Sequence, residues 1–192
     1  MARWVRSLWM VVALAGFWSS AMAVEEAAYT VVRADGAYEL RDYAPQVLAE
    51  TVVEGDLDAA GSAAFSPLFG YISGKNASRS KFEMTAPVAQ RPAAGKDRWA
   101  VSFVMPAGNA LEKMPIASDS RVQLRQVPAQ RMAALRYSGT WSLKNYQQHK
   151  QQLDAWIVAQ GLKPAGEAVW ARYNAPFTPW FMRRNEILVP VT

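Results

Sequence analysis

The sequence contains no cysteine and only one histidine, His149. Without cysteine the chain has no disulfides, no thiolate metal ligands, no thiol nucleophile and no covalent c-type haem attachment. A Ser-His-acid triad would have to use His149, and no serine lies in a G-x-S-x-G sequence. Glycine-rich phosphate loops and clusters of metal-ligating residues are missing as well. The sequence therefore favours a binding protein over an enzyme.

The chain has only a small excess of positive charge. Its 21 Lys and Arg against 16 Asp and Glu give a formal net charge of +5. No block of consecutive Lys and Arg of the kind that marks a nucleic-acid surface is present. The densest basic points, from Lys75 to Lys81 and at Arg183-Arg184, are mixed with polar residues. Nucleic acid is therefore not an expected partner.

The N-terminal segment has the pattern of a signal peptide. Arg3 and Arg6 precede an apolar run from Leu8 to Trp18, and a small-x-small A-M-A sequence ends at Ala23. The run is too short to span a bilayer comfortably, which takes roughly 20 apolar residues. We predict that residues 1–23 are cleaved off after Ala23, leaving a periplasmic or secreted protein with no stable membrane anchor. The alternative is an uncleaved N-terminal anchor.

Residues 24–192 are enough for one domain with its own hydrophobic core. Apolar residues at spacings of three and four predict one helix from Leu57 to Ile72 and a second from Leu143 to Ile157, capped by Ser142. Pro67 is expected in the early turns of the first helix or at the start of a second segment. Alternating patterns predict strands at 29–33, 37–42, 47–53, 81–85, 99–105, 169–173 and 187–191, the last at a sheet edge because of its closing proline.

The two halves of this domain share residues at a constant offset of 84 positions. In both halves a strand, a break, a second strand and a glycine lead into a helix. This shared order favours an internal duplication. The matching pairs are Leu40 and Leu124, Arg41 and Arg125, Gln46 and Gln130, Ala49 and Ala133, and Gly55 and Gly139.

Four short motifs resemble those of one known family. They are Y-E-L-R-D-Y at 38–43, P-L-F-G-Y-I-S-G-K-N at 67–76, K-F-E-M-T-A-P-V at 81–88 and R-R-N-E at 183–186. In this order they resemble the signature of the SOUL haem-binding family. The resemblance extends over nearly the whole chain after residue 28. It implies an α+β fold, a distorted antiparallel β-barrel built from two pseudo-symmetric repeats with one helix each.

Haem, the cofactor that the resemblance implies, is flat and largely apolar. It needs an apolar cleft, basic groups at the rim for its propionates and, optionally, an axial ligand. The chain has eight Trp, eight Met and seven Tyr from which to build such a cleft. The candidate cofactor-binding residues are Phe65, Tyr71, Lys75, Lys81, Met84, His149, Trp180, Met182, Arg183 and Arg184.

Several of these residues have a second interpretation. His149 lies on or beside the apolar face of the second helix and is the candidate metal ligand, but axial ligation by His149, Met84, Tyr71 or no residue stays open. Aromatic residues at helical spacing, such as Phe65, usually pack in a core. Arg184 can pair with a glutamate two positions later.

We therefore expect an exported protein that binds haem or another tetrapyrrole non-covalently, to carry or buffer it outside the cytoplasm, and that is not an enzyme. Three alternatives remain. The cleft could take other amphipathic small molecules, Glu83 or Glu186 could act as acid or base on a bound ligand, or the domain could bind a protein partner and no small ligand.

Overall fold

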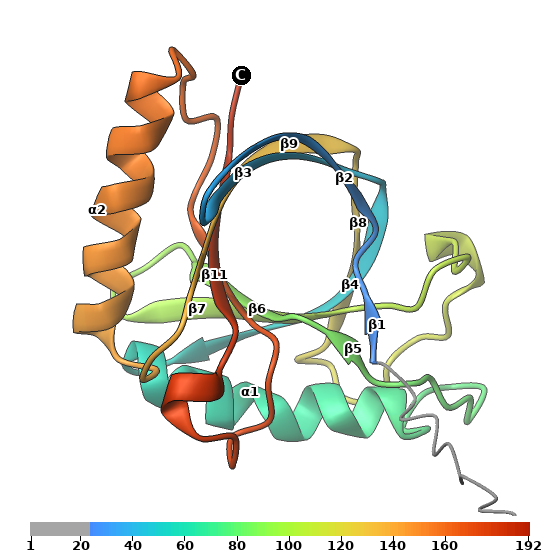
Figure 1. The fold of residues 1–192 in the computed structure, drawn as a ribbon. Coiled ribbons are helices and arrows are strands. Elements are labelled where there is room, and N and C mark those ends of the chain that lie inside the picture. The colour runs from blue at the N-terminus through green and yellow to red at the C-terminus, as the bar shows by residue number, and fades with distance from the viewer. Residues whose placement is uncertain (1–23) are drawn as a thin grey trace, which may run out of the picture.

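The computed structural model describes residues 24–192, so the predicted signal peptide lies outside the described residues. Within these residues the fold is α+β, as predicted, with two long helices and eleven strands (Figure 1). The elements are β1 (Glu25–Glu26), β2 (Tyr29–Asp35), β3 (Tyr38–Tyr43), β4 (Gln46–Glu54), α1 (Leu57–Ile72), β5 (Thr85–Ala86), β6 (Val88–Pro92), β7 (Arg98–Val104), η1 (Leu111–Lys113), β8 (Gln123–Val127), β9 (Gln130–Tyr137), α2 (Leu143–Ala159), β10 (Val169–Arg172), η2 (Trp180–Met182) and β11 (Asn185–Pro190).

Nine of the strands form one antiparallel sheet in the order β2-β3-β9-β11-β10-β6-β7-β4-β8. The sheet curls into an open barrel, and its two end strands, β2 and β8, are not paired with each other (Figure 1). The two remaining strands, β1 and β5, form a short parallel ladder beside it. The expected distorted antiparallel barrel is therefore confirmed.

Apart from β2 at one end, the strand order reads the same in both directions when β3, β4, β6 and β7 are matched with β8, β9, β10 and β11 respectively. In this matching β3 pairs with β9 of the second half, and β8 pairs with β4 of the first. The halves also meet at the centre of the sheet, where β6 pairs with β10. This order fits the duplication inferred from the sequence, which itself stays a prediction.

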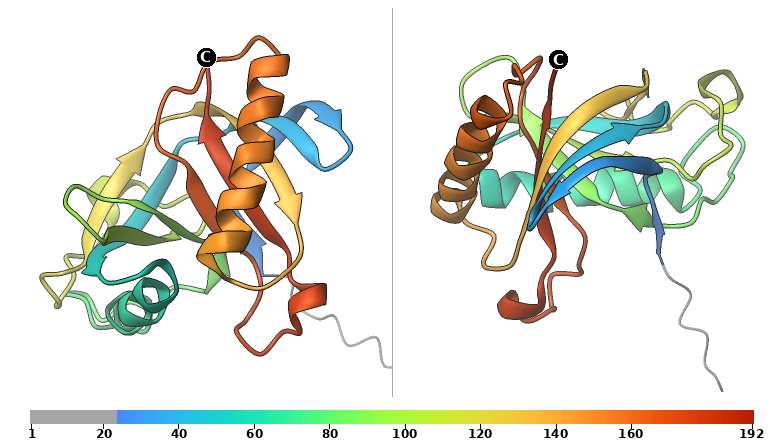
Figure 2. Two further views of the ribbon diagram at one scale, coloured as in Figure 1. Left: turned by 90° about the vertical axis from the view of Figure 1, so that its left-hand side faces the viewer. Right: turned by 45° about the horizontal axis from the view of Figure 1, so that its top comes forward.

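Both helices pack on the outer, convex face of the curled sheet (Figures 1 and 2). Leu153 and Ile157 of α2 are buried against Leu135 and Ile187 of the sheet. Leu68 and its neighbours on α1 form a second cluster against β4 and β7. Because side chains alternate along a strand, every second residue of the same strands points the other way, into the barrel.

Three details of the predicted elements are wrong. Residues 81–84 are not a strand, since the Phe82 amide donates to the carbonyl of Ile72 at the end of α1 and its ring stacks on Tyr71. Pro67 lies well inside one continuous helix rather than in its early turns. The last strand, β11, is central and does not lie at the sheet edge that was predicted from Pro190. The proline is tolerated there because, as the last residue of the strand, it removes only one hydrogen bond of the ladder.

The cap of α2 is as predicted, because the hydroxyl of Ser142 accepts a hydrogen bond from the Asn145 amide at 3.3 Å. We expect Ser142→Ala to lower the free energy of unfolding by about 1 kcal/mol, the usual cost of losing an N-terminal cap. Urea denaturation measures this. Ser62→Ala, at an exposed position inside α1, is the control and should lose nothing; equal losses in both variants would contradict the capping role.

Candidate ligand-binding cavity

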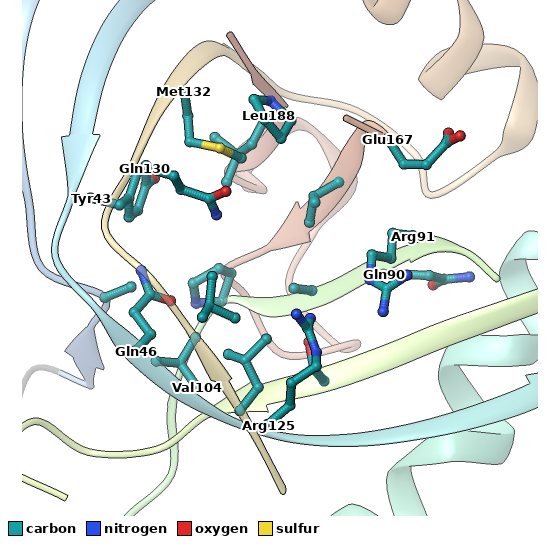
Figure 3. A pocket seen from close by; sticks show the side chains of 18 residues that line it. Tyr43, Gln46, Gln90, Arg91, Val104, Arg125, Gln130, Met132, Glu167 and Leu188 are labelled. Carbon is teal, nitrogen blue, oxygen red and sulfur yellow. The ribbon is translucent and has the colours of Figure 1, made fainter. Parts of the chain in front are cut away.

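The inside of the curled sheet holds an open-mouthed cavity of about 280 Å³ (Figure 3). Its walls come from the inward-facing residues of the strands. For example, Leu48 of β4 lines the cavity, whereas the neighbouring Ala49 packs against α1. The apolar lining consists mainly of Leu48, Val104, Val127, Met132, Val169 and Leu188. A ligand here would lie between aliphatic side chains.

Two arginines stand at one end of this cavity, and Tyr43, Gln130 and Met132 gather at the other (Figure 3). Arg91 and Arg125 share a single carboxylate, because Glu50 accepts from Arg91 at 2.9 Å and from Arg125 at 3.2 Å. These three side chains together carry a formal charge of +1, and Glu167 also lines the cavity. Since a guanidinium has five N–H donors, Arg125 keeps donors for an anionic group on a ligand.

A buried ionic network lies behind the Tyr43 end of the cavity. The Glu186 carboxylate accepts hydrogen bonds from Arg41 at 2.6 and 3.2 Å, from Arg184 at 2.9 Å and from the Tyr173 hydroxyl at 3.0 Å. Burial alone would raise the pKa of Glu186, but the hydrogen bonds and charges of Arg41 and Arg184 outweigh it and lower that pKa. Burial raises the pKa of Tyr43 to about 12, so its phenol faces the cavity in the neutral form.

This network bears on the proposed catalytic role of Glu186. Both of its oxygens are occupied by donors from the chain, and its side chain is fully buried. It does not line the cavity. Glu186 is therefore a structural carboxylate, and the second glutamate of that hypothesis, Glu83, lies exposed between α1 and β5.

Comparison with known proteins places this fold in a family. The model of the SOUL heme-binding protein family matches residues 24–190. The chain belongs to the SOUL haem-binding protein family. SOUL relatives include Heme-binding protein 2 of Mus musculus and of Homo sapiens, each 29% identical over 79% of this chain and 80% of the relative. Haem binding is thus supported for this SOUL chain at the level of its family, which is one of binding proteins.

Solved structures resemble the SOUL chain in fold. The C-terminal domain of EcmrR aligns with a TM-score of 0.59 at 12% identity, covering 85% of this chain and 98% of that one. A hydrolase from Listeria innocua aligns with a TM-score of 0.59 at 12% identity, covering 84% and 94%. At such low identity the likeness concerns the fold alone.

The ten candidate cofactor-binding residues do not come together at the cavity, and none of them lines it. One group lies around α1, outside the barrel. Phe65 is partly exposed and stacks on Phe69 at 5.4 Å, while Lys75 and Lys81 are exposed beyond the helix end. Met84 is half-buried against the α1 cluster.

Tyr71 requires a correction, because its side chain is almost fully buried beneath α1. Its hydroxyl donates to the Pro115 carbonyl at 3.0 Å, and burial raises its pKa to about 12. The side chain forms part of the core and does not line a surface cleft.

His149 lies on the inward side of α2, as the helical pattern predicts. Its ring stacks on Tyr137 with the centroids 3.9 Å apart, and Nδ1 lies 2.7 Å from the Asn145 carbonyl oxygen. Tyr137 points toward α2 and not into the barrel. His149 is therefore separated from the cavity by the sheet, and it is not placed to ligate an iron bound there.

The remaining candidates lie between β10 and β11. Trp180 and Met182 of η2 are exposed. Arg183 donates to the carbonyls of Thr178 and Pro176, each at 2.8 Å, and so closes this loop. Arg184 pairs with Glu186, which confirms the alternative interpretation of that arginine, and also with Glu26.

The sequence contained two signals for the cavity residues. Side chains alternate between the two faces of the sheet along β4, β7 and β8. The residues on the face away from the helices, Leu48, Val104 and Val127, could therefore be assigned to the inside of the barrel. Arg125 is also the repeat partner of Arg41, and in the structure each pairs with a glutamate on the concave side. The missing piece was the curl of the sheet, which turns that side into a cavity.

Residues 24–192 show neither a membrane-spanning helix nor a cluster of metal-ligating side chains. Within this range no helix combines the length and apolarity needed to cross a membrane. The same residues contain no group of three or more His, Cys, Asp and Glu side chains placed to hold a metal ion.

Proposed function

We propose that this SOUL protein binds haem or a related tetrapyrrole non-covalently in the concave cavity, and carries or buffers it outside the cytoplasm. The cavity itself supports the proposal, since it combines aliphatic walls with two arginines that share one carboxylate. The predicted leader before Val24 supports the place of action.

The residues present fit the chemistry of haem. Leu48, Val127 and Leu188 offer apolar contact to a macrocycle, and Arg91 and Arg125 offer N–H donors to propionates. When bound, haem supplies an iron centre. The chain supplies the apolar walls and the charge at the rim, and without a covalent bond the binding is reversible.

The size of the cavity favours a second candidate ligand. Ligand pockets usually measure about 300–1,000 Å³, and the cavity, at about 280 Å³, lies just below that range. Haem would therefore project from the open mouth, whereas a smaller amphipathic anion, such as a fatty carboxylate, would be enclosed more fully. The same arginines would bind its carboxylate.

A haem titration of residues 24–192, followed by Soret absorbance, tests the proposal. We expect saturation at one haem per chain. Arg125→Gln should weaken binding about tenfold through loss of a charge-assisted hydrogen bond, while Arg91 still compensates Glu50. Val169→Phe, which places a bulky ring in the cavity, should abolish saturable binding. Competition by laurate would identify the smaller amphipathic anion as a ligand of the same site.

Two control variants lie outside the barrel. His149→Ala and Lys75→Gln should leave both the affinity and the Soret band unchanged. A band moved by His149→Ala, together with normal binding by Val169→Phe, would place haem at the helices and refute the cavity. Binding that never saturates would refute the haem-carrier function.

A further inference from the structure

The loop between β10 and β11, residues 174–183, exposes an unusual amount of apolar surface. We call it the aromatic loop. The exposed fractions of its four large apolar side chains are 90% for Phe177, 58% for Trp180, 61% for Phe181 and 65% for Met182. Trp180 and Phe181 also contact each other edge to face, with ring centroids 5.6 Å apart. Large apolar side chains exposed together in one loop favour an interaction site.

The aromatic loop is held in shape without using these side chains. The Gly139 amide donates to the Trp180 carbonyl at 3.1 Å, and the Asn174 side chain accepts from the Arg184 amide at 2.5 Å. The Arg183 guanidinium also stacks over the Trp141 ring at 4.2 Å. Because the backbone is fixed in advance, docking of the exposed side chains costs little conformational entropy.

The described chain begins beside the same loop. Glu26 of β1 is ion-paired with Arg184 at 2.8 Å, directly after the aromatic loop. The loop with η2 and the start of β1 lie at the same end of the molecule (Figures 1 and 2). The residues before Val24, with their apolar run from Leu8 to Trp18, are thus joined to the fold at this end.

The charge around the loop favours an anionic surface. Residues 174–185 include Arg183 and Arg184 but no Asp or Glu, and the nearby Arg172 is buried. Arg184 is paired with carboxylates. Within residues 24–192, Arg183 contacts backbone carbonyls and the Trp141 ring but no carboxylate, so its charge is not neutralised.

We propose that the aromatic loop docks the domain onto the surface of a lipid bilayer. Phe177, Trp180, Phe181 and Met182 enter the interfacial region, where Trp and Phe are favoured, and Arg183 lies at the level of anionic headgroups. The loop lies next to the point where the segment that we expect to direct export joins the fold. Docking is independent of the ligand, because none of these residues lines the cavity.

Sedimentation with lipid vesicles tests this surface. Residues 24–192, which contain every element of the fold, are mixed with vesicles of phosphatidylcholine and with vesicles of phosphatidylcholine and phosphatidylglycerol. We expect binding, stronger with phosphatidylglycerol. The Phe177→Ser/Trp180→Ser/Phe181→Ser variant should bind at least about tenfold more weakly, since burying even one large apolar side chain is sufficient for such a change. Brominated lipids should quench the tryptophan fluorescence, and less so in Trp180→Phe.

Ile116→Ser and Val158→Ser, at exposed apolar positions on other parts of the surface, are the matched controls and should bind vesicles like the wild type. The triple variant should retain haem binding if the cavity holds the ligand. Wild-type protein that stays in solution with both kinds of vesicle would overturn the proposal. Loss of haem binding in the triple variant would also overturn it and would assign the loop to the ligand site. If the wild type is a dimer in solution and the triple variant is a monomer, the loop binds a second copy of the chain and not a bilayer.

Discussion

Glu186→Gln is expected to lower the free energy of unfolding by about 3 kcal/mol, the lower end of the cost of breaking a buried ion pair. The variant keeps the shape of the side chain but removes its charge, and Arg41, which is almost fully buried, loses its buried counterion and retains only the partly exposed Glu39. Arg184 retains Glu26, which limits the loss. Urea denaturation at neutral pH gives the change directly.

A surface ion pair provides the control. Asp154→Asn breaks the pair between Lys150 and Asp154 on α2, in which both side chains are about two-fifths exposed. We expect about 0.5 kcal/mol or less, because solvent screens such pairs. Similar losses in both variants would show that Glu186 is no more important than a surface charge.

The same carboxylate gives stability a pH dependence. Arg41 and Arg184 lower the pKa of Glu186 below its ordinary value of 4.5. Its contribution is therefore fully present above about pH 4.5, the pKa of the unfolded chain, and is lost as the pH falls through the lower pKa of the folded state. The wild type and Glu186→Gln should differ at neutral pH and converge in acid. A difference independent of pH would contradict this assignment.

Leu153→Ala is expected to lower the free energy of unfolding by about 3 kcal/mol, within the range of 2–5 kcal/mol for emptying a buried leucine site. Leu153 is fully buried where α2 meets β9 and β11. Leu143→Ala removes the same atoms from the same helix at a position that is 47% exposed, and it should cost about 0.5 kcal/mol or less. Thermal and urea unfolding of this matched pair measure the strength of the α2 contact, and equal losses would contradict it.

Local patterns predicted the elements of this protein well, because they depend on neighbours in the sequence. The spacing of Leu57 and Ile72 gave the bounds of α1, and Ser142 gave the start of α2. The strand expected at 81–85 failed for a tertiary reason. Its backbone finds partners at the end of α1, and Phe82 packs on the ring of Tyr71, so alternation there does not reflect a sheet.

The site was harder to predict, because it depends on which face of the sheet is concave. Candidate residues such as Tyr71 and His149 serve the packing of the helices against the outside of the sheet. The sequence indicated Arg125 only as the residue that matches Arg41 in the repeat. Its approach to Glu50, in a strand 75 positions away, follows from the pairing of β4 with β8, which no local pattern specifies.

The exchange of strands between the halves also determines the time at which the sheet can close. β4, β6 and β7 can pair with one another as soon as the first half is complete, but β3 has no partner other than β2 until β9 exists. Tyr43 of β3 can pair only once Gln130 of β9 has been made, and β9 needs β11, near the end of the chain, as its second neighbour. During synthesis from the N-terminus, the edge of β3 thus stays open until β9 has emerged, and the other edge of β9 stays open until β11, so the sheet can close only when nearly all of the chain is available.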